Sequence, residues 1–101
     1  MYDMKHLTKL GTLGKNAPAA MKAFQEFDKV ALETGAIPKK YKELIALAVA
    51  LTTQCPYCLE IHKKHAVEAG ATPEELTEVT FIAAALRAGA AVTHGLHLMD
   101  Q

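Results

Sequence analysis

The residues best suited to chemistry are two cysteines, Cys55 and Cys58, the only cysteines in the chain. Pro56 between them suits the first position of a helix, which makes Cys55 the residue that caps it. The unpaired N–H groups and the positive end of the dipole at a helix N-terminus favour a thiolate over a thiol. The spacing therefore predicts a reactive redox or metal pair and not a long-range structural disulfide.

Two further residue types accompany the thiols. His62 follows Cys58 by four residues, so a base lies on the same helix face. If the helices before and after the cysteines run antiparallel around a reversal near Gln54, Glu43 comes level with the turn that holds His62 and His65. Glu43 is then too deep to reach Cys58 itself but can orient an imidazole that does. The group predicts a nucleophile, a base and an orienting carboxylate.

Each member of this group also has a structural interpretation. Glu43 alone is better explained as an acid that complements the dipole at its helix start. His62 and His65 alone fit exposed helix positions, and Tyr57 and His65 are accessory candidates only. The combination favours chemistry, and it leaves open which histidine is the partner of Glu43.

Three other chemistries use the same residues. Cys-Pro-Tyr-Cys is the motif of glutaredoxins, but that fold needs strands around its site. Covalent haem attachment needs a histidine directly after Cys58, where Leu59 stands. A zinc site remains a minority alternative. Its four ligands would all lie on one short helix, from which a tetrahedral arrangement around the metal is difficult to form. These ligands would be Cys55, Cys58, His62 and His65.

The elements that must position these residues are all predicted to be helices. Apolar residues recur at helical spacing and strand alternation is missing. A lead-in helix is expected to break at Gly11 and Gly14, and a proline-led helix opens at Pro38 with an inward face that includes Tyr41 and Ile45. The other helices are expected from Asn16 to a left-handed stop at Gly35, from Pro56 to Gly70, and from a capping box at Thr72 onward with an interruption near Gly89.

Composition limits the remaining choices. The 101 residues are 50% hydrophobic, with eleven basic and eleven acidic residues. Such a chain predicts one domain over residues 1–101, and its apolar share is more than a small core absorbs, so we expect an oligomer. A net charge of zero argues against a nucleic-acid partner. The longest apolar run is Leu44–Leu51, Arg87 interrupts the other apolar segment, and no secretory core follows the first residues, so we expect a cytoplasmic protein without a membrane span.

Taken together, these residues resemble a known family. The runs 43–50 and 55–58, followed by His62, are similar to the carboxymuconolactone decarboxylase-like superfamily and, within it, to the alkylhydroperoxidase D branch. That pattern has a glutamate twelve positions before the first cysteine and a histidine four after the second, as here. The resemblance covers about residues 17 to 95, and it implies an all-helical subunit that assembles as trimers or hexamers.

The resemblance also implies roles. Cys58 corresponds to the peroxidatic thiol, Cys55 to the resolving thiol, and Glu43 with His62 to a proton relay. Tyr57 stands where the best-studied pattern has a histidine, which leaves peroxidase rate and reductant open. We therefore expect a thiol-dependent peroxidase or disulfide oxidoreductase that needs no bound cofactor. Its partners would be a hydroperoxide and a dithiol reductant, either lipoyl or thioredoxin-like. The alternative is a non-catalytic helical oligomer whose cysteines sense redox state or hold zinc.

Overall fold

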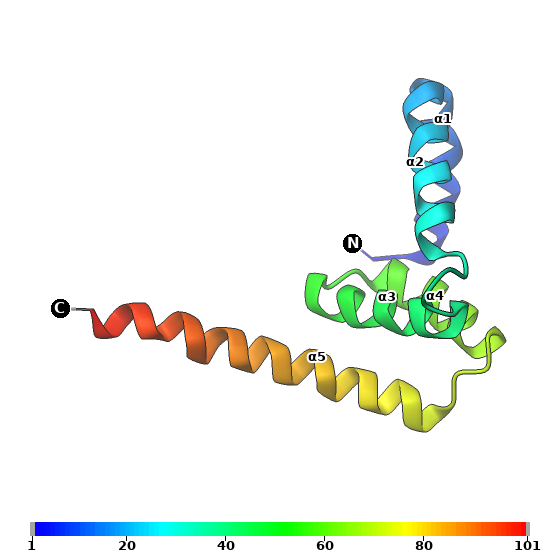
Figure 1. The fold of residues 1–101 in the computed structure, drawn as a ribbon. Helices are drawn as coiled ribbons and strands as arrows, with labels where there is room; N and C mark the ends of the chain where they lie inside the picture. The colour runs from blue at the N-terminus through cyan, green and yellow to red at the C-terminus, as the bar shows by residue number, and fades with distance from the viewer. Residues whose placement is uncertain (1, 101) are drawn as a thin grey trace.

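The computed structural model describes residues 2–100, and over this range the chain is helical without strands (Figure 1). The predicted all-α fold is confirmed. Two short 3₁₀ helices, η1 and η2, flank five α-helices. In chain order the elements are η1 (Met4–Lys9), α1 (Leu10–Asn16), α2 (Pro18–Leu32), α3 (Lys39–Thr53), α4 (Pro56–Glu68), α5 (Pro73–His94) and η2 (Gly95–Met99).

Helices α3 and α4 form an antiparallel pair that holds the core. The chain reverses at Gln54, which adopts the left-handed conformation with φ 57°, and this is the predicted position of the reversal. Leu44 and Leu47 of α3 pack with the fully buried Ala66 of α4. A small residue at position 66 lets the two helices approach closely, which brings their facing side chains within hydrogen-bond reach.

The face that α3 buries differs from the predicted one. Tyr41 and Ile45, expected to face inward, are 49% and 51% exposed. The buried residues of α3 are Glu43, Leu44, Leu47 and Ala50. The second half of α3 is apolar nearly all round, so its periodicity cannot select a face, and packing against α4 and α5 selects it instead.

Helix α5 begins with the predicted capping box. The Thr72 hydroxyl accepts a hydrogen bond from the N–H of Glu75, and the Glu75 carboxylate accepts one from the N–H of Thr72. Leu76 and Val79 pack against the core. The helix then runs through Gly89 without the expected interruption and projects away from α3 and α4 (Figure 1).

The projecting part of the chain leaves its apolar side chains uncovered in the single chain. Pro73–Met99 is long and apolar enough to cross a bilayer, with a mean hydropathy of 1.3 in its most apolar window, of which 6% is buried. The segment meets these criteria of length and hydropathy although it contains Arg87, contrary to the expectation from the sequence. Length and composition are weak evidence for a span, because a helix covered in a soluble assembly meets the same criteria.

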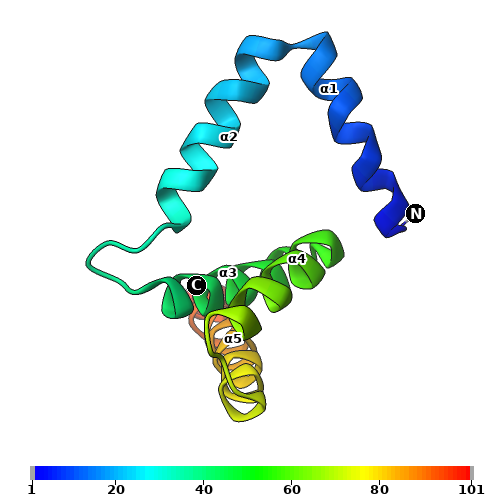
Figure 2. The ribbon, with the colours of Figure 1, turned by 90° about the vertical axis from the view of Figure 1, so that its right-hand side faces the viewer.

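The N-terminal helices form an arch over the α3–α4 pair, and the chain start returns toward α4 (Figure 2). Helix α1 continues through Gly11 and Gly14, where a break was expected. Gly14 lies against Met21 of α2, and a Cβ built at Gly14 would stand 3.4 Å from the Met21 Cγ. A Cβ at position 14 would therefore meet Met21 at an ordinary van der Waals distance.

Two helix boundaries predicted for α2 are wrong. Asn16 is the last residue of α1, and Ala17 precedes α2, because a residue before a proline is driven away from helical backbone. At the other end α2 stops at Leu32, with Glu33 already extended, so Gly35 is not a left-handed stop. The left-handed glycine is Gly70, with φ 99°, after α4 as predicted.

Candidate active site

The two cysteines form a disulfide at the start of α4. Cys55 caps the helix and Pro56 is its first residue, as the sequence predicts. The Cα atoms of Cys55 and Cys58 lie 5.3 Å apart, and the Cys55 Sγ accepts a hydrogen bond from the N–H of Cys58 at 3.3 Å. Both residues are partly buried. The Cα separation lies within the range that is usual for disulfides.

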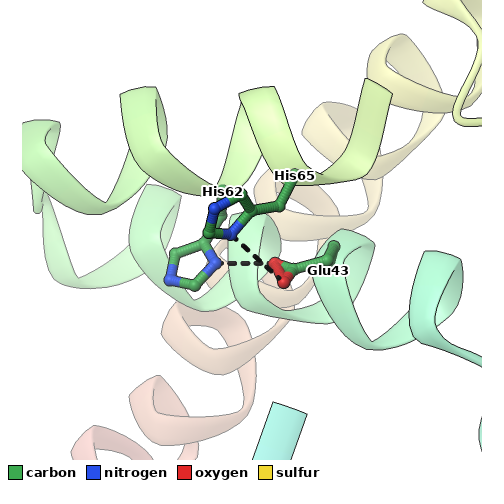
Figure 3. Close-up of side chains that lie close together, drawn as sticks. All are labelled: Glu43, His62 and His65. Carbon is green, nitrogen blue, oxygen red and sulfur yellow. Dashed lines mark hydrogen bonds and ion pairs between the residues drawn. The ribbon is translucent and has the colours of Figure 1, made fainter. Parts of the chain in front are cut away.

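The deepest polar residue is Glu43, which α3 presents to α4 (Figure 3). Its side chain has no exposed surface, and its Oε2 lies 2.6 Å from Nδ1 of His62. A carboxylate can only accept, so the His62 Nδ1–H donates and its Nε2 is left as the second site for a proton. The imidazole is thereby oriented by an acid on the neighbouring helix.

A lysine sets the charge of this carboxylate. Burial raises the pKa of Glu43, but Lys39 and His62 lower it more strongly, and the net result is a pKa below the ordinary value. Lys39 Nζ lies 2.9 Å from Oε1 and also donates to the carbonyl of Leu32. Glu43 is therefore ionised at neutral pH. Within the described residues, Oε1 has no hydrogen-bond partner of good geometry despite this ion pair.

His65 approaches the same carboxylate from the next turn of α4. Its Nδ1 lies 3.6 Å from Oε1 of Glu43, too far for a hydrogen bond. The rings of His62 and His65 meet edge to face, with centroids 5.8 Å apart. Of the two histidines left open by the sequence, His62 makes the hydrogen bond, and His65 completes a three-residue cluster around Glu43 (Figure 3).

A cavity of about 670 Å³ lies beside both the disulfide and this cluster. Of the two cysteines, Cys58 lines it, together with Glu43 and His62. Apolar side chains of the arch form the opposite wall; they include Leu7, Leu10, Phe24 and Leu32. The cavity can hold a molecule with an apolar body and a reactive end at Cys58.

Tyr57 points toward the N-terminal segment. Its ring meets that of Tyr2 edge to face at 4.9 Å, and its hydroxyl accepts a hydrogen bond from the N–H of Asp3 at 3.3 Å and lies 3.4 Å from Nδ1 of His6. The Tyr2 hydroxyl also donates a hydrogen bond to the carboxylate of Glu60, and this contact raises the pKa of Tyr2 to about 12. The accessory candidate thus contacts the chain start as well as the cavity.

Two residues near the site were missed in the sequence. Lys39 precedes Glu43 by four residues, and this spacing on a predicted helix was a readable signal for an ion pair. His6 lies 51 positions before Tyr57, so no local pattern could have connected them.

Comparison with known proteins agrees with the fold and shows the family. A model of the carboxymuconolactone decarboxylase family matches residues 18–101. A carboxymuconolactone decarboxylase family protein from Legionella pneumophila, known from a crystal structure, has 38% sequence identity to this chain. The two structures align with a TM-score of 0.76 over 81% of this chain and 73% of that one. This chain belongs to the carboxymuconolactone decarboxylase family, and the resemblance drawn from the motif is confirmed at that level.

Other relatives share most of their length with this chain. A protein from Methanobacterium thermoautotrophicum, known from a crystal structure, has 28% sequence identity to this chain. The two structures align with a TM-score of 0.82 over 89% of this chain and 98% of that one. A protein described as uncharacterized protein 4 in the cox locus of Paracoccus denitrificans is 45% identical, over 84% of this chain and 77% of its own. An uncharacterized protein of Haemophilus influenzae is 47% identical, over 94% of this chain and 85% of its own length.

Proposed function

We propose that this protein is a thiol-dependent peroxidase or disulfide oxidoreductase of the alkylhydroperoxidase D-like type. The observation that carries the proposal is the 2.6 Å contact between Glu43 Oε2 and His62 Nδ1, one helical turn beyond Cys58. Because the carboxylate is buried and ionised, it stabilises a positive charge on His62 when the imidazole takes up a proton.

The oxidative step begins with the reduced pair. His62 accepts the proton of Cys58, and the thiolate attacks one oxygen of a hydroperoxide. The O–O bond breaks, Cys58 becomes a sulfenic acid, and the departing alkoxide takes the proton from His62 and leaves as an alcohol. Glu43 touches neither the sulfur nor the peroxide in this scheme and acts through His62.

The second step forms the disulfide. The Cys55 sulfur attacks the sulfenic acid, the S–S bond forms, and water carries away the oxygen. An external dithiol then reduces the disulfide by exchange, and two electrons per cycle pass through sulfur without a bound cofactor. The assignment of Cys58 as the attacking thiol is supported by its place on the cavity wall and its spacing from His62. The reductant is proposed to be lipoyl or thioredoxin-like.

A homo-oligomer in the cytoplasm, a trimer or hexamer, is part of the proposal. The single chain exposes large apolar side chains on α5 and α2, which subunit contacts would cover. They include Phe81, Leu86, Val92, Phe24 and Phe27.

The test is steady-state consumption of cumene hydroperoxide with dihydrolipoamide, glutathione or thioredoxin as reductant. We expect turnover with a dithiol and complete loss of it in Cys58→Ser. An unchanged rate in Cys58→Ser contradicts the proposal. Absence of turnover with every reductant favours the non-catalytic alternative, a redox-sensing or zinc-holding cysteine pair. Metal content measured together with protection of both thiols from alkylation separates these two.

A further inference from the structure

Three metal-binding side chains from two helices meet at one point. One ligand atom from each of Glu43, His62 and His65 lies within 4.8 Å of the others, and this is the three-ligand cluster found among residues 2–100. We propose that these three residues form a binding site for a divalent transition-metal ion of the zinc type, separate from the cysteine pair. Figure 3 shows both imidazoles directed at the carboxylate.

The donor set suits zinc. Two imidazole nitrogens and one carboxylate oxygen form a recurrent three-ligand zinc site that leaves a fourth position open. Tetrahedral bonds of about 2.0–2.1 Å place ligand atoms roughly 3.3 Å apart. His65 Nδ1 lies 3.6 Å from Glu43 Oε1, already near this value. His62 Nδ1 lies 2.6 Å from the other oxygen, Oε2, so binding of an ion to Oε1 requires the hydrogen bond between His62 and Oε2 to open.

The carboxylate itself points to a missing ligand. Glu43 Oε1 is buried and, among the described residues, has no hydrogen bond of good geometry. A buried anionic oxygen is costly unless a cation or donor satisfies it. At present the nearby cation is Lys39, whose side chain is 43% exposed and whose Nζ is shared between Oε1 and the carbonyl of Leu32. A metal ion and the Lys39 ammonium therefore compete for the same oxygen.

The surroundings leave room for the fourth ligand. All three residues line the cavity of about 670 Å³, so a water molecule can complete the shell. In the disulfide form the sulfurs of Cys55 and Cys58 are bonded to each other, and the site needs neither of them. This separates it from a zinc site built on the cysteines.

Metal binding has a consequence that rests on the proposed function. An ion held by Glu43 and His62 replaces the hydrogen bond between them, so the proton relay and the metal exclude each other. Zinc should therefore inhibit peroxide turnover, whereas binding itself does not depend on any activity.

The experiment measures binding on the oxidised protein without a histidine tag. A thiol assay first verifies that no free cysteine is present; Co²⁺ is then titrated by absorption spectroscopy and Zn²⁺ by calorimetry. We expect one ion per chain, and at least a tenfold weaker affinity in His65→Gln, a variant that is expected to fold because this side chain is 45% exposed. Lys39→Met should bind more tightly, because the competing cation is gone.

A second histidine pair provides the matched control. His94 and His97 have the same spacing, with ring centroids 5.3 Å apart, but are not part of a three-ligand cluster in the described chain. The double variant His94→Gln with His97→Gln should keep the affinity of the wild type. Equal affinity in wild type and His65→Gln, or loss of binding in the His94 and His97 variant, overturns the inference. Peroxide turnover is measured on the same samples, so failure of the enzyme and failure of the metal site are read separately.

Discussion

Glu43 Oε2 and His62 Nδ1 lie 2.6 Å apart across the α3–α4 pair, although no part of the glutamate side chain is exposed. Removing a carboxylate from water is costly, and the ammonium of Lys39 contributes to offsetting that cost. The contacts with Lys39 and His62 keep the acid charged, and the hydrogen bond to Glu43 fixes the orientation of the imidazole. The helix packing that buries the acid therefore also prepares the histidine for proton transfer.

Glu43→Gln should lower kcat/KM for cumene hydroperoxide by about 10- to 100-fold, less than the roughly 10²- to 10⁴-fold attributed to the proton-transferring group itself, because Glu43 acts through His62. Glutamine keeps the size of the side chain but cannot stabilise a positive imidazole. Peroxide consumption with a dithiol measures the effect, and circular dichroism verifies the fold. Glu78→Gln, on the exposed side of α5, is the matched control and should match the wild type. A rate for Glu43→Gln equal to that control would exclude the relay.

Substitutions of the two histidines should reduce turnover to different extents in the same assay. His62→Gln is expected to slow turnover by about 100-fold, because the group that accepts the proton is lost. His65→Gln should have a clearly smaller effect, since its Nδ1 stands 3.6 Å from the carboxylate and makes no hydrogen bond. The reverse order of the two losses would assign the partner of Glu43 to His65.

Much of this geometry could be read from the sequence because it depends on local signals. Pro56 and the Thr72 capping box mark helix starts, and the short reversal at Gln54 forces the neighbouring helices to run antiparallel. Once that holds, a similar distance from the reversal brings Glu43 level with the helical turn that holds His62 and His65.

The errors lie where tertiary contacts decide. Tyr41 has the helical spacing of a core position relative to Leu44 and Ile45, but its actual neighbours left it 49% exposed. Gly14 was read as a helix breaker, but α1 continues through it and packs against α2, which no local pattern signals. The contact of His6 with Tyr57 joins distant parts of the chain and was equally out of reach.

The roles of the two cysteines can be separated by trapping. Cys55→Ser should still react once with hydroperoxide and accumulate a sulfenic acid on Cys58, because no second thiol remains to displace the oxygen. Dimedone labelling followed by mass spectrometry should find the adduct at Cys58. Cys58→Ser should give no adduct. Labelling of Cys55 in Cys58→Ser, with none in Cys55→Ser, would reverse the assignment.

The ion pair between α3 and α5 should give the fold an acid-sensitive contact. Lys40 Nζ lies 2.9 Å from Glu75 Oε2, and this contact, followed by the N–H of Thr72, holds the pKa of Glu75 below its ordinary value of 4.5. A carboxylate whose folded pKa is depressed adds stability above its unfolded pKa, and this contribution is lost as the pH falls through the folded value. Glu75→Gln should therefore lower Tm by a few degrees at about pH 6, and the gap to wild type should narrow as the pH falls below 4.5.

The matched control for this contact is Glu74→Gln. Glu74 occupies the same first turn of α5, so both substitutions remove a charge that complements the helix dipole. Only Glu75 also forms the capping box and the ion pair to Lys40. The difference in Tm between the two variants is measured by circular dichroism across the acid range. Because both variants lose one charge in the first turn and keep all the other carboxylates, this difference reports only the capping box and the ion pair of Glu75. A difference that stays constant from about pH 6 to about pH 3 would show that the Lys40 pair contributes nothing to the acid sensitivity of the fold.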